Sequence, residues 1–304
     1  MSNVRKIKKA LKSNPTLEGA GVHLKRAFGF SQKPQLDPFL LLDDFQSDNP
    51  ADYIKGFPWH PHRGIETITY LLEGSVEHGD SLGNEGVIYP GDVQWMTAGS
   101  GIIHQEMPKG DEKGRMHGLQ LWANLPASHK MMTPRYRDVT SGQIPEAKLD
   151  NDIRIKIVAG NINGTSGPVQ DIVINPEYLD VVLPAGITLT HPVNTGHTVF
   201  AYVLQGNGYF EPERDPYGYE LIGNNYFDFK RECIVKPGTL VIYEQGDHVE
   251  ISAGMENLRF LLISGKPIRE PIAWYGPIVM NTQEELRTAF EEFQNGSFLK
   301  HNTE

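Results

Sequence analysis

A strand-and-turn unit occurs twice in this chain of 304 residues, and this repeat constrains the fold more than any other feature. The first half contains Tyr70–Gly74, which reads YLLEG, and the second half contains Tyr202–Gly206, which reads YVLQG, 132 residues later. Each is an apolar run that a glycine ends, a pattern typical of a strand followed by a turn. A unit repeated at domain scale predicts two similar all-β domains in one chain.

A second pair of turns places an insertion in the second half. Pro90-Gly91 recurs as Pro237-Gly238, 147 residues later, so the second half is fifteen residues longer between the two landmarks. The segment 214–231, rich in Pro, Gly, Tyr and Asn, is the predicted insertion. From the repeat we expect an N-terminal domain over residues 1–140 and a C-terminal domain over residues 141–304.

The glycine and proline content excludes an all-helical fold. The chain has 31 Gly and 21 Pro, about 17% of its residues against an average of about 12%. One helix is nevertheless predicted near 282–295, with Asn281 or Thr282 as its cap and Asn295-Gly296 as its end. Its apolar stripe is predicted to pack against a sheet and consists of Leu286, Ala289, Phe290 and Phe293.

The charge balance argues against broad binding to nucleic acid or to an anionic membrane. The chain has 28 basic and 38 acidic side chains and a formal net charge of −10. The basic run from Arg5 to Lys12 is the exception, and it fits either a nuclear address or anion-binding arm, or a solvated amphipathic segment. We expect the solvated segment, and neither nucleic acid nor a membrane as a direct partner.

Cysteine usage and the lack of long apolar runs indicate a compartment. Cys233 is the single cysteine, so an internal disulfide is impossible and a reducing environment fits. The sequence shows no secretory signal and no apolar run of membrane-spanning length. We therefore expect a cytoplasmic protein.

Two short histidine motifs in the first half form a candidate metal site. His60 and His62 are separated by one residue, as are His104 and Glu106, and this spacing places each pair on one face of a strand. If the two strands face each other, three imidazoles and one carboxylate converge. This nitrogen and oxygen ligand set suits a first-row divalent metal and leaves coordination positions open for substrate or dioxygen.

The second half provides an internal control for this site. The two offsets place Pro192 and Asn194 at the positions of His60 and His62, and Ile251 and Ala253 at those of the other pair. No ligand type is retained, so we expect the second domain to be free of metal.

The surroundings of these residues resemble the pirin family, within the cupin superfamily. Phe57–Thr67 reads FPWHPHRGIET, and the similarity continues through Pro90–Gly99 (PGDVQWMTAG), Gly101–Glu106 (GIIHQE) and His117–Trp122 (HGLQLW). The resemblance is dense over about residues 19–137 and weaker beyond, where the region around Trp274 is recognisable.

The resemblance implies a bicupin, with two antiparallel jelly-roll β-barrels in one chain and one mononuclear metal in the N-terminal barrel. The family's four ligands fall on His60, His62, His104 and Glu106. The implied metal is Fe(II), with Cu, Mn, Ni, Co or Zn as alternatives. Glu66, the acid of the general cupin motif, is not normally a ligand in pirins, and we expect it beside the ligands instead.

The resemblance also implies an activity like that of quercetin 2,3-dioxygenase, in which dioxygen opens the central ring of a flavonol and carbon monoxide is released. Glu106 is the expected catalytic base, because a carboxylate beside the substrate can take the proton of its 3-hydroxyl. Four nearby side chains either line an apolar pocket for a planar substrate or fill the barrel core: Phe57, Trp59, Trp95 and Met96.

Two alternatives to an enzyme stay open at this point. The chain could be a non-enzymatic regulator of the transcription co-regulator type, in which the redox state of the metal tunes a surface for a protein partner. It could also be a small-molecule-binding bicupin whose metal is structural. Replacement of Glu106 separates the enzyme from the structural metal, because only the enzyme predicts lost turnover in an intact fold. The regulator instead predicts that affinity for a partner differs between the reduced and the oxidised metal.

Overall fold

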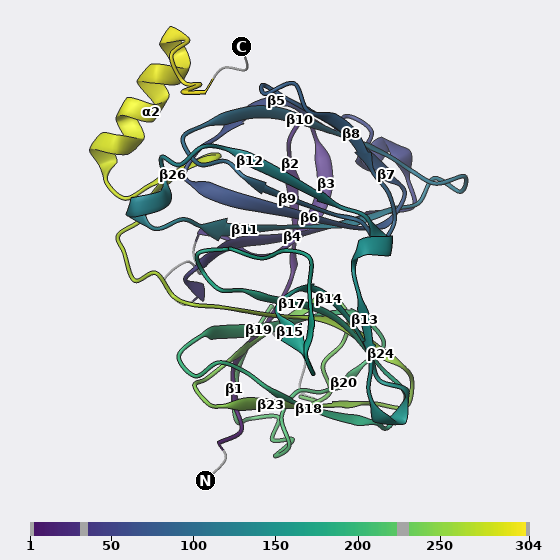
Figure 1. Ribbon diagram of the computed structural model, residues 1–304. Helices are drawn as coiled ribbons and strands as arrows, with labels where there is room; N and C mark the ends of the chain where they lie inside the picture. The colour runs from purple at the N-terminus through teal and green to yellow at the C-terminus, as the bar shows by residue number, and fades with distance from the viewer. Residues whose placement is uncertain (1–2, 31–35, 224–230, 302–304) are drawn as a thin grey trace. The chain divides into compact units, whose positions relative to one another are not determined.

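The computed structural model describes residues 3–30, 36–223 and 231–301, and strands dominate it (Figure 1). The chain divides into two compact units. Pro15–Ser141 and Ile268–Glu304 form the first, which we call the N-terminal barrel. Met1–Asn14 and Gly142–Pro267 form the second, the C-terminal barrel. No helix among the described residues has the length and apolar character needed to cross a membrane.

The N-terminal barrel consists of two antiparallel sheets. Its seven-stranded sheet has the order β12 (Arg135–Val139), β9 (Val93–Thr97), β6 (Ile65–Glu73), β11 (Met116–Asn124), β4 (Phe39–Ser47), β3 (Val22–Phe28) and β2 (Asn14–Glu18). Its four-stranded sheet has the order β5 (Phe57–His62), β10 (Ile102–Lys109), β7 (Ser75–Asp80) and β8 (Glu85–Ile88). Alternating inward and outward residues give each strand one face toward the interior.

The C-terminal barrel has a corresponding large and small sheet. The large sheet has the order β13 (Glu146–Lys148), β14 (Arg154–Ala159), β17 (Glu177–Leu183), β24 (Leu258–Gly265), β19 (Thr198–Gln205), β22 (Thr239–Tyr243), β1 (Ile7–Lys12) and β21 (Glu220–Ile222). The small sheet has the order β18 (Thr188–Pro192), β23 (His248–Ala253) and β20 (Gly208–Tyr209). A two-stranded ladder joins β15 (Asn161–Ile162) to β16 (Thr165–Ser166). Short 3₁₀ turns occur in the chain at Pro50–Asp52, Ala127–His129, Ser141–Gln143 and Asp150–Asp152.

The predicted repeat is confirmed by the sheet order. The four central strands β9-β6-β11-β4 of one barrel correspond in order to β22-β19-β24-β17 of the other. Gly74 and Gly206 both follow the repeated strand with positive φ, 81° and 73°. Gly91 and Gly238 have φ of 90° and 74° in the two Pro-Gly turns, a conformation that favours glycine. The predicted all-β fold of two cupin barrels is therefore correct.

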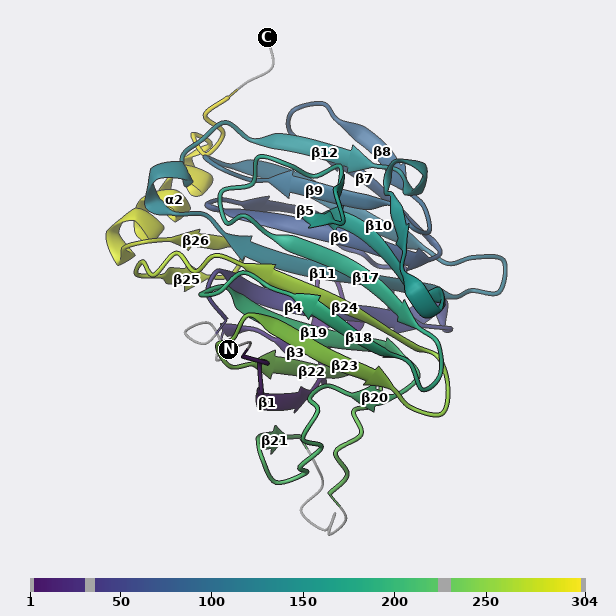
Figure 2. The same ribbon diagram turned by 60° about the horizontal axis from the view of Figure 1, so that its bottom comes forward.

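Each terminal segment of the chain belongs to the barrel at the other end of the sequence: residues 1–14 to the C-terminal barrel and residues 268–304 to the N-terminal barrel. The expected ranges 1–140 and 141–304 differ from this division at both ends. Strand β1 pairs antiparallel with β22, in the large sheet of the C-terminal barrel (Figure 2). Arg5, just before β1, is fully buried, and its guanidinium donates to the carbonyls of His197, Glu244 and Gly246. The segment beginning at Ile268 returns to the N-terminal barrel. Most of the N-terminal basic run is thus part of a sheet, and the expectation of a solvated segment is wrong for Arg5.

The predicted C-terminal helix is confirmed as α2 (Gln283–Asn295). Thr282 caps it in a capping box with Glu285, and Gly296 ends it with a left-handed φ of 82°. The helix packs on the small ladder of β25 (Ala273–Tyr275) and β26 (Ile278–Met280), as Figure 1 shows in yellow. The apolar contacts between them include Leu286 and Ala289.

The predicted insertion 214–231 lies between β20 and β22, where the N-terminal barrel instead has the hairpin of β7 and β8. Its described part contains β21, which pairs parallel with β1. Residues 224–230 of the predicted insertion lie outside the described residues.

Candidate metal centre

Two paired strands of the N-terminal barrel bring three histidines together. In the antiparallel pair of β5 and β10, His104 lies opposite His60, and Ile102 lies opposite His62. Because side chains alternate along a strand, His60 and His62 project from the same face. The ligand atoms of the three histidines all lie within 4.8 Å of one another. We call these residues the three-histidine group.

The Nε2 atoms of this group fit a shared cation. His60 Nε2 lies 3.0 Å from His62 Nε2, and His104 Nε2 is buried without a hydrogen-bond partner among the described residues. Two nitrogens at adjacent coordination positions, each about 2.1 Å from one ion, are about 3.0 Å apart. An orphaned buried nitrogen and two facing lone pairs are costly unless a cation or proton lies between them. The donor set therefore fits a divalent metal.

The other ring nitrogens already have partners that orient the three rings. His60 Nδ1 lies 2.8 Å from the carbonyl oxygen of Pro58, and His62 Nδ1 lies 3.1 Å from that of Pro277. His104 Nδ1 lies 3.3 Å from the Tyr136 hydroxyl. A carbonyl can only accept, so Nδ1 of the first two rings carries the proton and Nε2 presents a lone pair. Metal-binding histidines are commonly fixed in this way.

Burial favours the neutral form that a metal requires. It lowers the pKa of His60 and lowers the pKa values of His62 and His104 well below the usual histidine range. The charges of the neighbouring imidazoles lower the pKa values of His62 and His104 further. The group is therefore uncharged at neutral pH and ready to bind a cation without releasing protons.

Glu106 lies on β10 beside the group but outside the set whose ligand atoms are within 4.8 Å. The pairing register shifts between His104 and Glu106, and the Thr69 hydroxyl donates to Glu106 Oε1 at 3.1 Å. Burial raises the pKa of Glu106 to about 7, which suits a group that exchanges protons near neutral pH. Its roles as fourth ligand and as base remain predictions.

A cavity of about 750 Å³ opens beside the three-histidine group, within the size range of small-molecule sites. Carbon atoms dominate its wall. The Trp122 ring packs edge to face against the His62 ring, with 5.1 Å between the ring centroids, and its centroid lies 6.2 Å from that of the Trp274 ring. The residues that line the cavity include His60, His62, Glu106, Thr69, Gln120, Arg26, Asp43, Leu24, Leu41, Phe45, Phe57, Pro58, Val76, Trp122, Trp274 and Pro277.

Of the four side chains considered for this pocket, Phe57 lines the cavity. Trp59 is 55% exposed, because it lies where the β5–β10 register shifts. Trp95 and Met96 are fully buried, and Met96 belongs to a core cluster. The alternative of barrel core therefore holds for Met96.

Glu66 lies on the opposite face of β6 from Thr69 and accepts a hydrogen bond from the Thr97 hydroxyl at 2.7 Å. Glycine at position 64, with φ of 78°, separates β5 from β6, so parity does not carry over from the histidines to Glu66. The expectation that Glu66 lies beside the ligands is wrong.

Several residues around the site were not predicted from the sequence. Tyr136 and Pro277 hold ring nitrogens but lie far from the histidines in the sequence. Thr69 and Gln120 line the cavity, and their hydroxyl and amide oxygens are 2.5 Å apart. Strand alternation places Gln120 and Trp122 on one face of β11, but the sequence does not show that this face points into the barrel.

A C-terminal strap, which we define as residues 273–298, holds the turn after His62. The backbone N–H of Val279 donates to the Arg63 carbonyl at 3.1 Å. Arg63 is buried and forms an ion pair with Glu292 at 2.7 Å, and it donates to the Phe298 carbonyl at 2.7 Å. Its guanidinium also lies 4.2 Å from the centre of the Phe298 ring. The strap thus anchors the strand that carries two of the three histidines.

The corresponding strands of the C-terminal barrel are lined differently. In the pair of β18 and β23, Ile251 lies opposite Leu189, and both belong to the apolar core. The offset had placed Pro192 at the position of His60, but the register places Leu189 opposite Ile251, as His60 lies opposite His104. His191 on the same strand lies 3.1 Å from Glu177.

Comparisons with known proteins agree with this picture. Residues 21–123 match the family model for pirin, and residues 178–299 match the model for the pirin C-terminal cupin domain. A pirin-like protein of Caulobacter vibrioides is 41% identical over 97% of this chain and 99% of its own length.

Two solved structures are similar in fold. A quercetin 2,3-dioxygenase from Acinetobacter baumannii has a TM-score of 0.83 and 31% identity over 97% of this chain and 98% of its own. A bacterial pirin from Escherichia coli in complex with nickel(II) has a TM-score of 0.60 and 21% identity over 84% and 95%. The family models and the relative at 41% identity, together with the barrel pair and its histidines, show that this chain belongs to the pirin family.

Proposed function

We propose that this protein is a metal-dependent dioxygenase that opens the ring of a flavonol or a similar polyphenol, as quercetin 2,3-dioxygenases do. The observation that carries the proposal is the three-histidine group beside an apolar cavity of about 750 Å³. The likeness to a solved quercetin 2,3-dioxygenase over nearly the whole chain supports it.

In this proposal His60, His62 and His104 hold the metal, with Glu106 as a fourth ligand. A bound divalent metal would supply open coordination positions for the oxygen atoms of the substrate and for dioxygen. Fe(II) is our first expectation for the ion. The E. coli pirin was solved with nickel(II), so a panel of divalent ions is the appropriate test.

The side chains of the chain have three tasks in this reaction. Glu106 takes the proton of the 3-hydroxyl onto its carboxylate, for which a pKa of about 7 is well placed. Thr69 keeps that carboxylate oriented through its hydrogen bond. The aromatic rings of Phe57, Trp122 and Trp274 provide flat apolar walls that hold a planar substrate and exclude water.

The test is turnover by the purified protein loaded in turn with Fe(II), Ni(II), Mn(II), Co(II), Cu(II) and Zn(II). We expect the quercetin absorption band to bleach in step with oxygen consumption and carbon monoxide release for at least one ion. Absence of turnover with every ion would overturn the proposal.

Glu106→Gln tests the role of the carboxylate. We expect turnover to fall by 10²-fold or more, the typical contribution of a general base, while the melting temperature stays near that of the native protein. Glu177→Gln, which changes the partly buried acid beside His191 in the C-terminal barrel, is the matched control and should retain turnover. If Glu106→Gln lowered only stability, the metal would be structural.

A further inference from the structure

A row of polar side chains crosses the inner face of the large sheet of the N-terminal barrel. The pairing register places Arg26 opposite Asp43, Asp43 opposite Gln120, and Gln120 opposite Thr69. These four residues come from β3, β4, β11 and β6, and all four line the cavity. The row therefore runs from the partner of Glu106 to a charged pair at its other end.

The charged pair is tightly built. Arg26 Nε donates to Asp43 Oδ1 at 2.8 Å and Nη2 donates to Oδ2 at 2.7 Å, while Nη2 also lies 2.9 Å from Glu18. The Asp43 side chain is 7% exposed. A buried ion pair seldom stabilises a fold more than apolar residues of the same size would. This pair faces a cavity that is otherwise mostly apolar, which points to a ligand.

The spacing matches a ligand that also reaches the three-histidine group. Neighbouring strands lie about 4.8 Å apart, so Asp43, two strands from Thr69, is about 10 Å from it. Thr69 is bonded to Glu106 beside the histidines. A planar molecule whose central-ring oxygens lie at the metal would extend one of its outer rings along the row toward Asp43.

The chemistry of the pair specifies a group that both donates and accepts. Each carboxylate oxygen of Asp43 has a second lone pair beyond the one that Arg26 engages. The guanidinium of Arg26 has N–H donors on Nη1 in addition to those directed at Asp43 and Glu18. A phenolic hydroxyl can donate its hydrogen to the Asp43 carboxylate and accept a hydrogen bond from Arg26 Nη1.

We propose that the Arg26–Asp43 pair selects polyphenols that carry a hydroxyl remote from their metal-binding oxygens. The inference rests on the proposed function, because it assumes that a flavonol-like molecule occupies the cavity. It makes Arg26 and Asp43 specificity-determining residues at the end of the cavity remote from the three-histidine group.

The test compares two ligands under anaerobic conditions, where no turnover takes place. Quercetin has hydroxyls on both outer ring systems, whereas 3-hydroxyflavone has the 3-hydroxyl alone. Binding is measured by calorimetry with the metal-loaded native protein, with Asp43→Asn and with Arg26→Gln. Asp180→Asn is the matched control, because Asp180 forms a comparable buried pair with Arg259 in the C-terminal barrel.

We expect the native protein and Asp180→Asn to prefer quercetin by about tenfold or more, the effect of one hydrogen bond to a charged group. Asp43→Asn and Arg26→Gln should reduce that preference to about twofold or less, by weakening quercetin alone. Equal affinities in the native protein, or equal losses for both ligands, would overturn this inference and leave the proposed function standing. No binding of either ligand would overturn both.

Equal affinities of the native protein for the two ligands overturn the inference even if a variant fails to fold. The melting temperature of each variant is measured beside its affinities, so that a loss of structure is recognised. A variant that melts like the native protein and keeps the full preference for quercetin also overturns the inference.

Discussion

The two barrels share a strand order but fill their interiors in different ways. The C-terminal barrel has one continuous apolar cluster that includes Leu189, Phe210, Ile251 and Phe260. Three smaller apolar clusters lie in the described part of the N-terminal barrel, and its cavity lies among strands that carry histidine, threonine and glutamine inward. The same sheet order thus supports either a packed core or a site, depending on the inward residues of a few strands.

This difference shows that the polar groups of a site lower the stability of the barrel that contains them. The inward positions of the C-terminal barrel are mostly apolar, and His191, which shares the buried face of Leu189, has Glu177 as its partner. The N-terminal barrel has a buried unpaired nitrogen on His104 and a buried Glu106, both of which oppose folding in the absence of a ligand. The hydrogen bonds of Arg63 to Glu292 and Phe298 hold the end of β5 to the strap. These polar contacts add to the apolar packing of the smaller clusters.

The largest effect is expected from removing a histidine. His62→Ala should abolish stoichiometric metal binding, because it removes one of three converging nitrogens. His191→Ala, in the corresponding strand of the C-terminal barrel, should retain the full metal content. Elemental analysis of both purified variants provides the measurement, and equal metal contents would contradict the difference between the barrels.

A core substitution should affect the two barrels unequally. Phe260→Ala removes a fully buried ring from the continuous cluster and should cost about 3–5 kcal/mol of unfolding free energy. Trp122→Ala, at the wall of the cavity, should cost less, because its ring already borders open space. Denaturant unfolding of each variant measures this. A larger loss for Trp122→Ala would show that the cavity wall acts as core.

The strap should influence the metal without touching it. Arg63→Met breaks the ion pair with Glu292 and the hydrogen bond to the Phe298 carbonyl. It should weaken metal affinity about tenfold, because changes to groups that hold the ligand residues in place commonly have effects of this size. Arg259→Met removes an ion pair of the C-terminal barrel and should leave the affinity unchanged. Competition with a chelator measures both, and rescue by Arg63→Lys would show that the charge is responsible.

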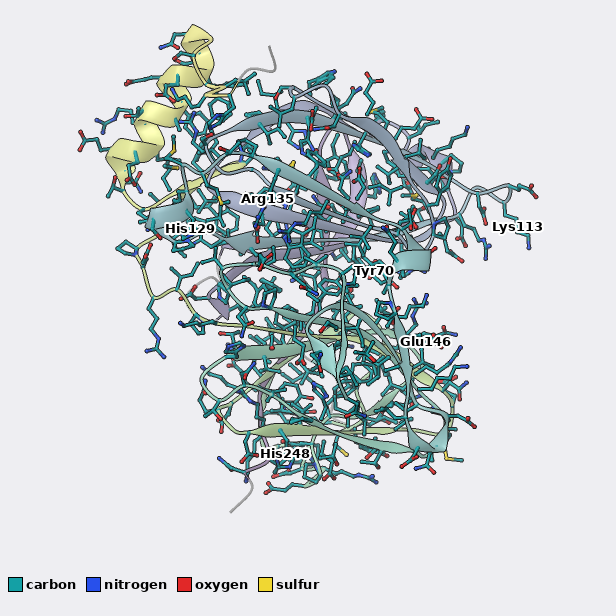
Figure 3. The ribbon with its side chains drawn as sticks, in the orientation of Figure 1. Tyr70, Lys113, His129, Arg135, Glu146 and His248 are labelled. Carbon is teal, nitrogen blue, oxygen red and sulfur yellow. The ribbon has the colours of Figure 1, made fainter. Side chains whose placement is uncertain are left out.

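The smallest effect concerns a loop of the N-terminal barrel. Asp111 accepts bonds from the backbone and side chain of Arg115, which lower its pKa to about 2, and Lys113 lies at the tip of this loop (Figure 3). Because the folded pKa is below that of the unfolded chain, the stabilisation is present above about pH 4 and is lost as the pH falls through about 2. An NMR titration of the Asp111 carboxyl measures this pKa. A midpoint near 4 would contradict the contacts.

Local patterns predicted much of the fold and the centre of the site. The repeat with its glycine turns, the capped helix and the i, i+2 histidines are all encoded within a few residues, and strand alternation converts them into positions. Pairing across long separations has no such local code. Pro277 contributes a carbonyl that any residue would have, and Tyr136 is recognised only once β12 is placed beside β9.

The same limit applies to the terminal segments. The basic run from Arg5 to Lys12 looks solvent-exposed in the sequence, and only the fold shows the carbonyl oxygens that accept hydrogen bonds from Arg5. The row from Arg26 to Thr69 was likewise invisible, because its four members come from four strands whose register the sequence does not display.

The strap also determines when the metal centre can form during synthesis. His62 emerges from the ribosome 215 residues before the carbonyl of Pro277 that orients its ring. Strand β1 likewise waits for its partner β22, more than two hundred residues later. All residues of the C-terminal barrel have been made once Pro267 is added, whereas the N-terminal barrel also needs the segment that begins at Ile268. The three-histidine group can therefore reach the geometry described here only after nearly the whole chain has been made.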